Sequence, residues 1–413
     1  MKEAVTVAIV GGGVAGLALA MNLEKRGVSC RVYETAPELK ELGVGITLLP
    51  HATREIDALG LLGEIKSLAI ENLESCFFNR FGQLLYKEPR GKYAGYRHPE
   101  LGIHRGRLHM ALYKAALALL GPERLATNRQ CTGITQDDSG VLVQLRETTT
   151  GADLAPVRAA VAIGCDGINS AVRKQFYPDE KLAFAGINSW RGVTRRKPIL
   201  TGRSYMRIGS IRTGKIVVYP IIDNVDGQGN QLINWMAEIQ SDTVAQNDWN
   251  KPGRLEDFLA IYENWKFDWL DVGALIRSAD TILEYPMVDR DPVARWTFGR
   301  VTLAGDAAHP MYPRGSNGAA QALIDARTLA DLLQRHDDPA AALKEYEARR
   351  LDATAKVVRT NREHPPDFIN IRVEELVGDR PFDDLAAYIT NDELKALSDQ
   401  YKRVAGFALE DVA

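Results

Sequence analysis

The sequence predicts an α/β protein in which a parallel sheet built from βαβ units carries an inserted antiparallel sheet and a C-terminal helical region. Three observations lead to this fold class. An apolar run enters a glycine-rich turn near the N-terminus, the middle of the chain alternates apolar and polar residues, and the chain is charged and helical in pattern from about residue 338. Strands interleaved with helices build parallel sheets, whereas successive alternating strands build antiparallel ones.

The N-terminal stretch has every part of a βαβ unit. The apolar, β-branched run at 5–10 is typical of a strand buried on both faces, and the motif G-x-G-x-x-G follows it at residues 11–16. A helical pattern over 17–26 stops at a glycine, and a second strand ends at Glu34, an acid about 20 residues beyond the glycines. The unit predicts a Rossmann-like fold that binds a dinucleotide.

Each glycine of this motif has a separate physical role. Gly11 permits the tight turn, Gly13 lets the backbone approach a pyrophosphate, and Gly16 lets helix and strand pack closely. Glu34 is placed to accept hydrogen bonds from a ribose, and its charge would repel a 2′-phosphate. FAD or NAD is therefore expected rather than NADP. The alternative is a glycine-rich turn without a ligand.

Composition excludes several classes of function. A formal net charge of −3 and a pI near 6.2 give no basic surface for nucleic acid. No apolar run reaches the roughly 18 residues that span a bilayer, and the first strand starts too early for a signal peptide, so a cytoplasmic protein is expected. The four cysteines form no C-x-x-C pair and the histidines show no metal-binding spacing, so no metal site is expected.

Two further strands end in an acid. Asp166 follows the apolar run 160–165, and Asp306 follows the run 301–304. A Pro/Gly-rich loop over 311–318 then precedes a long amphipathic helix over 319–334. In open α/β sheets the carboxyl ends of the strands face the ligand crevice, so both carboxylates are expected to lie there.

These stretches together resemble the FAD-dependent aromatic hydroxylases, the group A flavoprotein monooxygenases with the para-hydroxybenzoate hydroxylase fold. The resemblance covers roughly residues 5–350. It is closest to the branch that holds salicylate and 3-hydroxybenzoate hydroxylases and the phenazine-carboxylate monooxygenase. The segments most similar to the phenazine enzyme are 189–193, 285–292 and 306–321.

The residue patterns along the chain predict a division into domains. Residues 1–74, 98–181 and 285–337 are expected to form a discontinuous FAD-binding domain. Residues 75–97, which read as a hairpin, and 182–284 are expected to form the substrate domain. Residues 338–413 are expected to form a C-terminal helical region. Within it, Pro365-Pro366 separates the charged helical part from a polar tail. The charged C-terminal helices are a candidate interface for a homodimer.

The resemblance also implies residues that bind FAD. Besides the three glycines at the pyrophosphate and Glu34 at the adenosine ribose, the family pattern places Arg105 at the ribityl or phosphate portion, Asp166 near FAD and nicotinamide, and Asp306 at the ribityl hydroxyls. Three alternatives stay open: a surface or salt-bridge role for Arg105, a turn role for Asp166, and an N-cap role for Asp306.

A helix N-terminus is expected beside the flavin ring. The family pattern turns the backbone amides of Asn317, Gly318, Ala319 and Ala320 toward the pyrimidine edge of the flavin. Reduction of the flavin adds negative charge there, and the positive end of a helix dipole stabilises an anion. This argument is independent of the resemblance.

The chemistry implied by the resemblance is aromatic hydroxylation. NADH or NADPH reduces FAD, O2 adds at flavin C4a, and the hydroperoxide passes an oxygen atom to an electron-rich ring. Only one G-x-G-x-x-G motif is present, so the choice between NADH and NADPH stays open. A flavin-dependent reductase or dehydrogenase, and a non-catalytic FAD-binding sensor, are the alternatives on this scaffold.

The substrate is expected to be a small aromatic or heteroaromatic acid. Tyr219 is the first candidate for a hydroxyl contact, and the backbone carbonyl of Pro313 is the second catalytic candidate. Arg191 is a candidate partner for a substrate carboxylate, with a domain-bridging role as its alternative. Trp235 is a candidate pocket residue, with the core as its alternative. Residues 182–288 contain no histidine to act as a base, which favours an ionised or heterocyclic acid.

Overall fold

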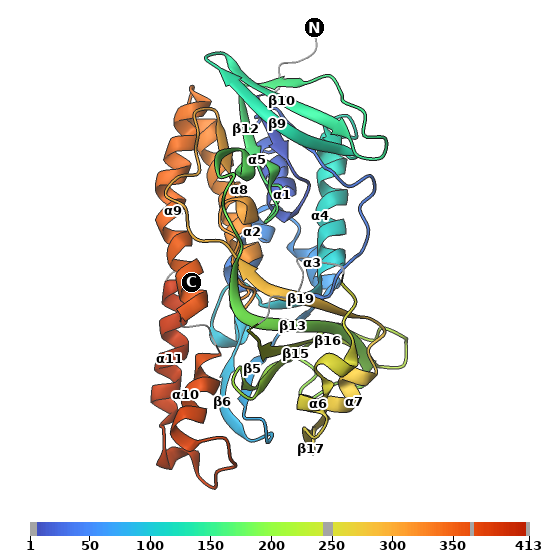
Figure 1. Cartoon of the computed structure of the whole chain (residues 1–413), viewed down its shortest axis with the longest axis vertical. Helices are drawn as coiled ribbons and strands as arrows, with labels where there is room; N and C mark the ends of the chain where they lie inside the picture. The colour runs from blue at the N-terminus through green and yellow to red at the C-terminus, as the bar shows by residue number, and fades with distance from the viewer. Residues whose placement is uncertain (1–5, 243–250, 364–366, 410–413) are drawn as a thin grey trace.

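A five-stranded parallel sheet forms one end of the elongated molecule in the computed structural model, which describes residues 6–242, 251–363 and 367–409 (Figure 1). The strand order is β20-β12-β1-β2-β8, and every neighbouring pair is parallel. The strands are β1 (Val7–Val10), β2 (Cys30–Tyr33), β8 (Leu125–Ala126), β12 (Val161–Gly164) and β20 (Val301–Leu303). The expected N-terminal strand is confirmed over residues 7–10, and Val5 lies outside the described residues.

Helices and a second sheet bury the apolar strands. The helices are α1 (Val14–Glu24), α4 (Arg105–Leu120), α8 (Gly318–Arg335) and α9 (Pro339–Glu363), with α1 packed between α4 and α8. The antiparallel sheet β11-β10-β9 packs against β1, β2 and β12. Its strands are β9 (Arg129–Asp137), β10 (Gly140–Glu147) and β11 (Val157–Ala159). Every residue of β1 and β12 is buried, which explains their unbroken apolar runs.

Smaller elements connect the parallel sheet to the rest of the chain. Strands β3 (Gly45–Leu48), β4 (Ala69–Glu71) and β7 (Leu101–His104) form one small antiparallel sheet. Helices α2 (Pro50–Ala58) and α3 (Leu62–Ser67) lie between β3 and β4 in the sequence. Helix α5 (Ala171–Phe176) follows β12. Ser170 is the N-cap of α5 and accepts a hydrogen bond from the Arg173 amide.

A seven-stranded sheet forms the second layer of the molecule. Its order is β19-β13-β16-β15-β14-β5-β6. The strands are β5 (Glu74–Phe78), β6 (Leu84–Pro89), β13 (Ala183–Arg196), β14 (Ser204–Ser210), β15 (Gly214–Ile222), β16 (Gln231–Gln240) and β19 (Ile282–Asp289). The expected hairpin is confirmed as β5–β6, and β19 crosses the boundary expected at residue 284.

One junction of this sheet departs from the antiparallel arrangement. β5 pairs with β14 in parallel, whereas all other neighbours in the sheet are antiparallel. The β5–β6 hairpin comes from a distant part of the chain and joins the sheet edge, so no short turn fixes its direction relative to β14. The antiparallel sheet expected from residues 182–288 is confirmed, and the parallel pair arises only where the β5–β6 hairpin joins it.

The two faces of the large sheet have different neighbours. The outer face carries a core that includes Trp190, Trp235 and Phe258, closed by α6 (Leu259–Tyr262) and α7 (Val272–Arg277). The inner face carries Tyr205, Val217, Tyr219 and Met236. It approaches the parallel-sheet layer, because Asn234 Oδ1 on β16 accepts a hydrogen bond of 2.7 Å from the Gly45 amide on β3.

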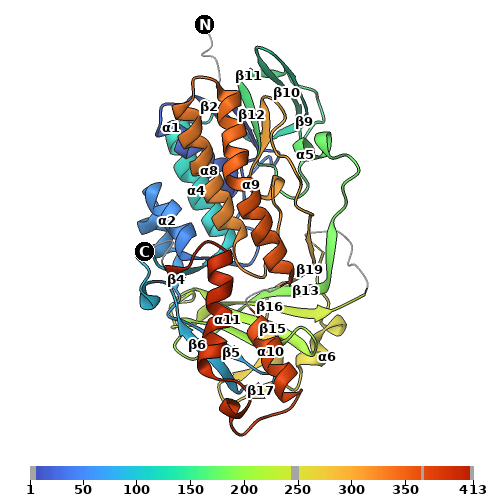
Figure 2. The ribbon, with the colours of Figure 1, turned by 90° about the vertical axis from the view of Figure 1, so that its left-hand side faces the viewer.

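The C-terminal region packs on the large sheet. Helices α10 (Phe368–Val377) and α11 (Asn391–Val404) lie beside it (Figures 1 and 2), and Ile369 and Leu394 share a core with Phe77 and Tyr86 of β5 and β6. The expectation of a polar tail is wrong, because sparse apolar residues at helical spacing are enough to bury one face of a charged helix. The break expected at Pro365-Pro366 lies outside the described residues.

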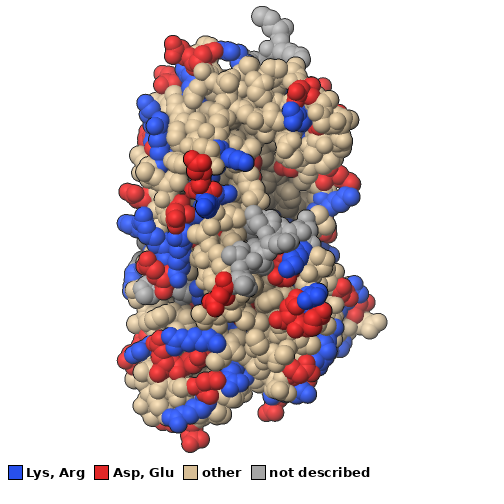
Figure 3. All heavy atoms as spheres, viewed as in Figure 1, with Lys and Arg blue, Asp and Glu red and all other residues tan. Residues whose placement is uncertain are grey.

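Charges of both signs intermix on the face shown in Figure 3. Among the described residues, no helix is long and apolar enough to cross a bilayer, and no group of three or more His, Cys, Asp or Glu side chains is placed to hold a metal ion. All four cysteines are buried free thiols.

Candidate active site

The turn between β1 and α1 requires glycine at two of its positions. Gly11 has φ +104°, and a Cβ there would lie 2.5 Å from the Cys165 carbonyl oxygen. A Cβ on Gly16 would lie 2.0 Å from the Gly11 carbonyl oxygen. Gly13 instead faces open space and is the N-cap of α1, without a side-chain cap. The turn thus presents helix N–H groups to a space that an anion can enter.

Glu34 lies directly beside this turn. Its Oε2 accepts a hydrogen bond of 2.6 Å from the Gly12 amide, and its Oε1 accepts one of 2.7 Å from the Ala36 amide. These bonds fix the carboxylate at the end of β2, where each oxygen retains a lone pair for a ribose hydroxyl.

Asp166, after β12, is engaged with its own chain. Its carboxylate accepts a hydrogen bond of 2.5 Å from Ser170 Oγ and one of 3.2 Å from the Val172 amide. Burial raises the pKa of Asp166, and the hydrogen bonds oppose that shift. This carboxylate stabilises the loop before α5, which is the turn role considered above.

Asp306, after β20, has a different environment. Its side chain is exposed and makes no hydrogen bond or ion pair with any described residue. Partial desolvation by the surrounding chain raises the pKa of Asp306, although its side chain is exposed, and His309 and Arg105 oppose the shift. Arg105, at the start of α4, is also exposed and has no acidic partner in the described part of the chain. The structure brings these two unpaired charges together.

Helix α8 begins beside Asp306 with free donors, since a Cβ on Gly318 would lie 3.8 Å from Asp306 Oδ1. Asn317 is its N-cap but does not cap it with its side chain. The first amide with a helical partner is that of Gln321, which donates to the Asn317 carbonyl. In the described residues, no acceptor pairs with the amides of Gly318, Ala319 or Ala320, so they are free to bind an acceptor.

The side chain of Asn317 joins three distant helices. Its Oδ1 lies 3.1 Å from His51 Nε2 on α2, and its Nδ2 donates to Tyr401 Oη on α11 at 2.8 Å. Tyr401 Oη in turn donates to Asn361 Oδ1 on α9 at 2.8 Å. Burial lowers the pKa of His51 to about 3, so its ring is neutral at pH 7. Nothing in the sequence pattern pointed to His51, Asn361 or Tyr401.

Tyr401 also presses against the loop before α8. A Cβ on Gly315 would lie 1.5 Å from Tyr401 Oη, so only glycine fits at this loop position. The next residue, Ser316, has φ +55°, a left-handed conformation that non-glycine residues seldom adopt. The C-terminal helix therefore fixes the shape of the loop that leads into α8.

We expect Tyr401→Phe to lower the free energy of unfolding by about 1–3 kcal/mol, because it leaves the Asn317 amide and the Asn361 carbonyl buried without this partner. Chemical denaturation of the purified protein measures the change. Tyr388→Phe is the matched control, since Tyr388 is 41% exposed. A Tyr401→Phe protein as stable as the Tyr388→Phe protein would contradict the role of this network.

The large sheet separates the candidate substrate residues. Tyr219 is on the inner face, where its ring stacks on Tyr205 with centroids 4.8 Å apart, and burial raises its pKa so that the hydroxyl stays protonated at pH 7. Trp235 is on the outer face, where Nε1 donates to Thr194 Oγ1 at 3.1 Å. Trp190 shares that outer core and stacks on Phe258. The structure does not bring Trp235 together with Tyr219.

Arg191, also on the inner face, has no carboxylate partner among the described residues. Its Nε has no hydrogen-bond partner, and its guanidinium lies 5.3 Å from the centroid of Tyr285. Burial lowers the pKa of Arg191. Pro313 lies exposed in the loop before α8, and no described donor reaches its carbonyl oxygen.

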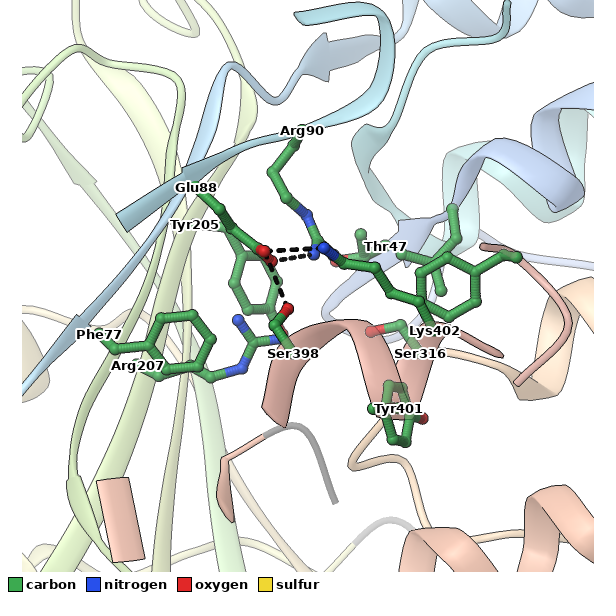
Figure 4. Close-up of a pocket in the computed structure, with 13 residues that line it drawn as sticks. Thr47, Phe77, Glu88, Arg90, Tyr205, Arg207, Ser316, Ser398, Tyr401 and Lys402 are labelled. Carbon is green, nitrogen blue, oxygen red and sulfur yellow. Dashed lines mark hydrogen bonds and ion pairs between the residues drawn. The ribbon is translucent and has the colours of Figure 1, made fainter. Parts of the chain in front are cut away.

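A pocket lies between the inner face, this loop and α11 (Figure 4). Its walls include Phe77, Tyr205, Arg207, Ser316 and Tyr401. Two other cations on its wall, Arg90 and Lys402, are paired with Glu88 at 3.0 and 2.8 Å. Arg207 is buried, donates to Ser75 Oγ and lies over the rings of Tyr205 and Phe77. Sequence reasoning missed Arg207; a signal was present in a charged residue inside an apolar strand.

The chain is similar to known proteins over most of its length. The family model described as "FAD binding domain" matches residues 4–361. The chain is 39% identical over 362 residues to phenazine 1,6-dicarboxylic acid hydroxylase PhzS of Lysobacter antibioticus, covering 86% of this chain and 89% of the relative. It is 31% identical over 379 residues to 3-hydroxybenzoate 6-hydroxylase of Polaromonas naphthalenivorans, covering 90% of each.

Solved structures share the fold at lower identity. A salicylate hydroxylase substrate complex superposes with a TM-score of 0.74 at 22% identity, covering 99% of this chain and 97% of that one. Klebsiella pneumoniae HpxO complexed with FAD and uric acid gives a TM-score of 0.73 at 21% identity, covering 98% and 96%. This likeness extends through the C-terminal helices.

Proposed function

The chain belongs to the FAD-dependent aromatic hydroxylases, and from this premise we propose that it uses NADH or NADPH and O2 to hydroxylate a small aromatic or heteroaromatic acid. One observation carries the proposal for the site. Unpaired polar groups from separate segments lie near one another: a Cβ on Gly318 would lie 3.8 Å from Asp306 Oδ1, and Arg105 is near enough to Asp306 to lower the pKa of its carboxyl. They are the Asp306 carboxylate, the Arg105 guanidinium and the free amides that begin α8.

These groups fit the parts of FAD. We assign the pyrophosphate to the turn of Gly11, Gly13 and Gly16, and the adenosine ribose to Glu34. The open space at Gly13 and the fixed carboxylate of Glu34 support this assignment. In the same way, we assign the ribityl chain to Asp306 and the ribityl or phosphate portion to Arg105. Neither side chain makes a hydrogen bond or an ion pair with a described residue.

Asp166 has a weaker claim on the cofactor. It follows β12 at the crevice edge and retains acceptor capacity beyond its bonds to Ser170 and Val172. We assign it a place near FAD and nicotinamide, with a second role in stabilising the start of α5.

The flavin ring belongs at the N-terminus of α8. Bound FAD supplies the redox chemistry: it accepts a hydride from the nicotinamide and activates O2 for transfer of one oxygen atom to the aromatic ring. The free amides of Gly318 and Ala319 and the helix dipole stabilise the negative charge of the reduced ring. Asn317 positions this helix start through its bonds to His51 and Tyr401.

The substrate belongs between the flavin and the inner face of the large sheet. Tyr219 offers a protonated hydroxyl, and the exposed carbonyl of Pro313 offers an acceptor to a substrate hydroxyl. Arg191 offers an unpaired guanidinium to a carboxylate. Because Trp235 lies on the outer face, we assign it to the core and not to the pocket. The hydroxylation of a phenazine dicarboxylic acid by the 39% identical relative supports a heteroaromatic acid for this chain.

A screen of aromatic acids tests the proposal. Each acid is added to the FAD-loaded protein with NADH or NADPH, and nucleotide oxidation, H2O2 and the oxygenated product are measured. An acid that stimulates oxidation and yields product in nearly equal amount is the expected result. H2O2 formed in the same amount with or without any acid would contradict hydroxylation and favour a reductase. No oxidation at all would favour an FAD-binding sensor.

We expect Tyr219→Phe to change the fraction of oxidised nucleotide that yields product, because it removes a hydroxyl next to the substrate while keeping the ring stacked on Tyr205. The measurement is product formed per nucleotide oxidised. Tyr93→Phe is the control, since Tyr93 is 46% exposed. An unchanged product yield in Tyr219→Phe would exclude Tyr219 from the site.

We place this reaction in the cytoplasm, where both nicotinamide nucleotides are available to an enzyme. The four buried free cysteines support a reducing compartment. A homodimer stays a proposal, to be tested by the mass of the protein in solution. The apolar sides of α10 and α11 do not favour it, because they are covered by this chain's own β5 and β6.

A further inference from the structure

A side-chain hydrogen bond joins the two layers of the molecule beside the candidate substrate site. Asn234 Oδ1 on β16 accepts a hydrogen bond of 2.7 Å from the Gly45 amide on β3. Asn234 pairs directly with Tyr219 of β15, and directly paired residues of antiparallel strands have side chains on the same face of a sheet. The bond therefore lies on the inner face of the large sheet, next to the tyrosine that is the first candidate for a substrate contact.

Two glycines let the small sheet of β3, β7 and β4 come this close to the inner face. A Cβ on Gly45 would lie 2.7 Å from both Cβ and Cγ of Asn234. A Cβ on Gly102 of β7 would lie 2.6 Å from the Pro220 carbonyl oxygen and 3.4 Å from Tyr219 Cδ2. Protein interiors are close-packed, so a larger residue at position 45 or 102 would push the two sheets apart.

The strands of the small sheet lead to residues that we assign to FAD. Strand β7 runs directly into α4 at Arg105, whose amide donates to the Val44 carbonyl at 2.9 Å. Strand β3 leads to α2, where His51 Nε2 lies 3.1 Å from Asn317 Oδ1 at the start of α8. A displacement of β3 would therefore move Arg105 and the start of α8 as well.

The separation of the two layers matters to the reaction. Transfer of an oxygen atom requires the substrate ring to be held in one orientation at the flavin, and a displacement of about 1 Å can cost roughly 100-fold in rate. A closed site also keeps activated oxygen from being lost as H2O2. A contact that sets this separation therefore affects how much of the oxidised nucleotide yields product.

We propose that Asn234 is a positioning residue for hydroxylation. Its bond to Gly45 holds the inner face of the large sheet, with Tyr219, in a fixed position relative to the residues that bind FAD. Asn234 acts through β3 and not by contact with the substrate or the flavin. This inference rests on the proposed function and adds to it a residue that controls the yield of product.

Three variants test the contact from both sides. Because Asn234 is 3% exposed, Asn234→Leu fills the same space and leaves the Gly45 amide without this acceptor, whereas Asn234→Asp keeps an oxygen that accepts from it. Gly45→Ala forces the same contact apart from the other layer. Product, H2O2 and nucleotide oxidation are measured with the FAD-loaded protein, and the binding of FAD is measured by flavin titration of the apoprotein.

We expect the yield of product per nucleotide oxidised to fall about 3- to 10-fold in both Asn234→Leu and Gly45→Ala, with a matching rise in H2O2. Asn234→Asp should keep most of the yield. The dissociation constant of FAD should rise about 3- to 10-fold in Asn234→Leu and Gly45→Ala, as loss of one hydrogen bond predicts. In the double variant the two effects should not add, since both changes break the same contact.

Two controls match these changes. Asn264→Leu replaces an exposed asparagine, and Gly63→Ala adds a Cβ where no atom lies within 4 Å. Both controls should keep the wild-type yield and the wild-type affinity for FAD. A merely structural role for Asn234 would lower the free energy of unfolding without changing the division of oxidised nucleotide between product and H2O2.

The outcomes separate this inference from the proposed function. A yield in Asn234→Leu equal to that of Asn264→Leu overturns the inference, as does unchanged binding of FAD in both Asn234→Leu and Gly45→Ala. An Asn234→Asp protein that loses as much yield as Asn234→Leu, or fully additive effects in the double variant, overturns it too. In each of these cases, product formed by the wild-type protein leaves the proposed function intact. If the wild-type protein forms no product from any aromatic acid, the proposed function fails and this inference fails with it.

Discussion

Asp306→Ala is expected to weaken FAD binding about 100-fold and to leave the folding of the apoprotein unchanged. The carboxylate makes no hydrogen bond or ion pair with any described residue, so its removal leaves no protein group unsatisfied. With FAD bound, a carboxylate that accepts from ribityl hydroxyls contributes about 1.5–3 kcal/mol, which corresponds to a change of roughly 10- to 150-fold in the dissociation constant. Flavin titration of the apoprotein measures binding, and thermal unfolding of the same sample measures stability.

Asp325→Ala is the contrast for this experiment. Asp325 lies near the same crevice, but its carboxylate accepts hydrogen bonds from the Gly305 amide at 3.0 Å and from Arg350 at 2.8 Å. Burial alone would raise its pKa, but His309 and Arg350 hold it below the usual range, so the ionised form is the stable one. Its loss should destabilise the apoprotein itself. An Asp306→Ala protein that binds FAD as fully as the wild-type protein would show that the ribityl assignment is wrong. An Asp306→Ala protein that unfolds as readily as Asp325→Ala would show the same.

Lys215→Met is expected to lower the free energy of unfolding by about 3–5 kcal/mol, because it leaves the buried Glu238 carboxylate without its cation and removes one of the two cations that face Asp367. Lys215 Nζ lies 2.6 Å from Glu238 Oε2 and 3.0 Å from Asp367 Oδ2, and Arg314 lies 2.9 Å from the same Asp367 oxygen. Burial alone would raise the pKa of Asp367, but Arg314 and Lys215 lower it, so this carboxylate is charged in the folded protein.

This ion cluster joins three parts of the molecule. Lys215 and Glu238 lie in the large sheet, Arg314 lies in the loop before α8, and Asp367 is the residue directly before α10. Lys215→Met should therefore also weaken the binding of FAD. Chemical denaturation measures the free energy of unfolding, and the release of flavin measures the loss of FAD binding. Lys395→Met is the control, since its pair with Asp399 is at the surface and worth well under 1 kcal/mol. Equal stability of the two variants would contradict the role of the cluster.

The parts of the site that the sequence could predict are local. A strand that ends in G-x-G-x-x-G fixes the position of its own turn, and an acid after an apolar strand is carried to the crevice by that strand. Gly11 and Asp306 could therefore be placed without knowledge of the rest of the fold. The start of α8 at Gly318 was predictable for the same reason, since its loop and helix are contiguous in sequence.

The parts that escaped prediction depend on how strands and helices pair over long distances. Alternation along β16 divides Trp235 from Asn234, but only the register Tyr219↔Asn234 and Val218↔Trp235 shows which of them shares a face with Tyr219. In the same way, α11 reads as a polar segment until Tyr401 is seen to reach Asn317.

The most direct test of hydroxylation by this protein is isotopic. The FAD-loaded protein is given NADH or NADPH, an aromatic acid that stimulates oxidation, and O2 enriched in oxygen-18. One labelled oxygen atom in the hydroxyl group of the product is the result expected here. A product that carries oxygen from water, or recovery of the label only in H2O2, would contradict the account.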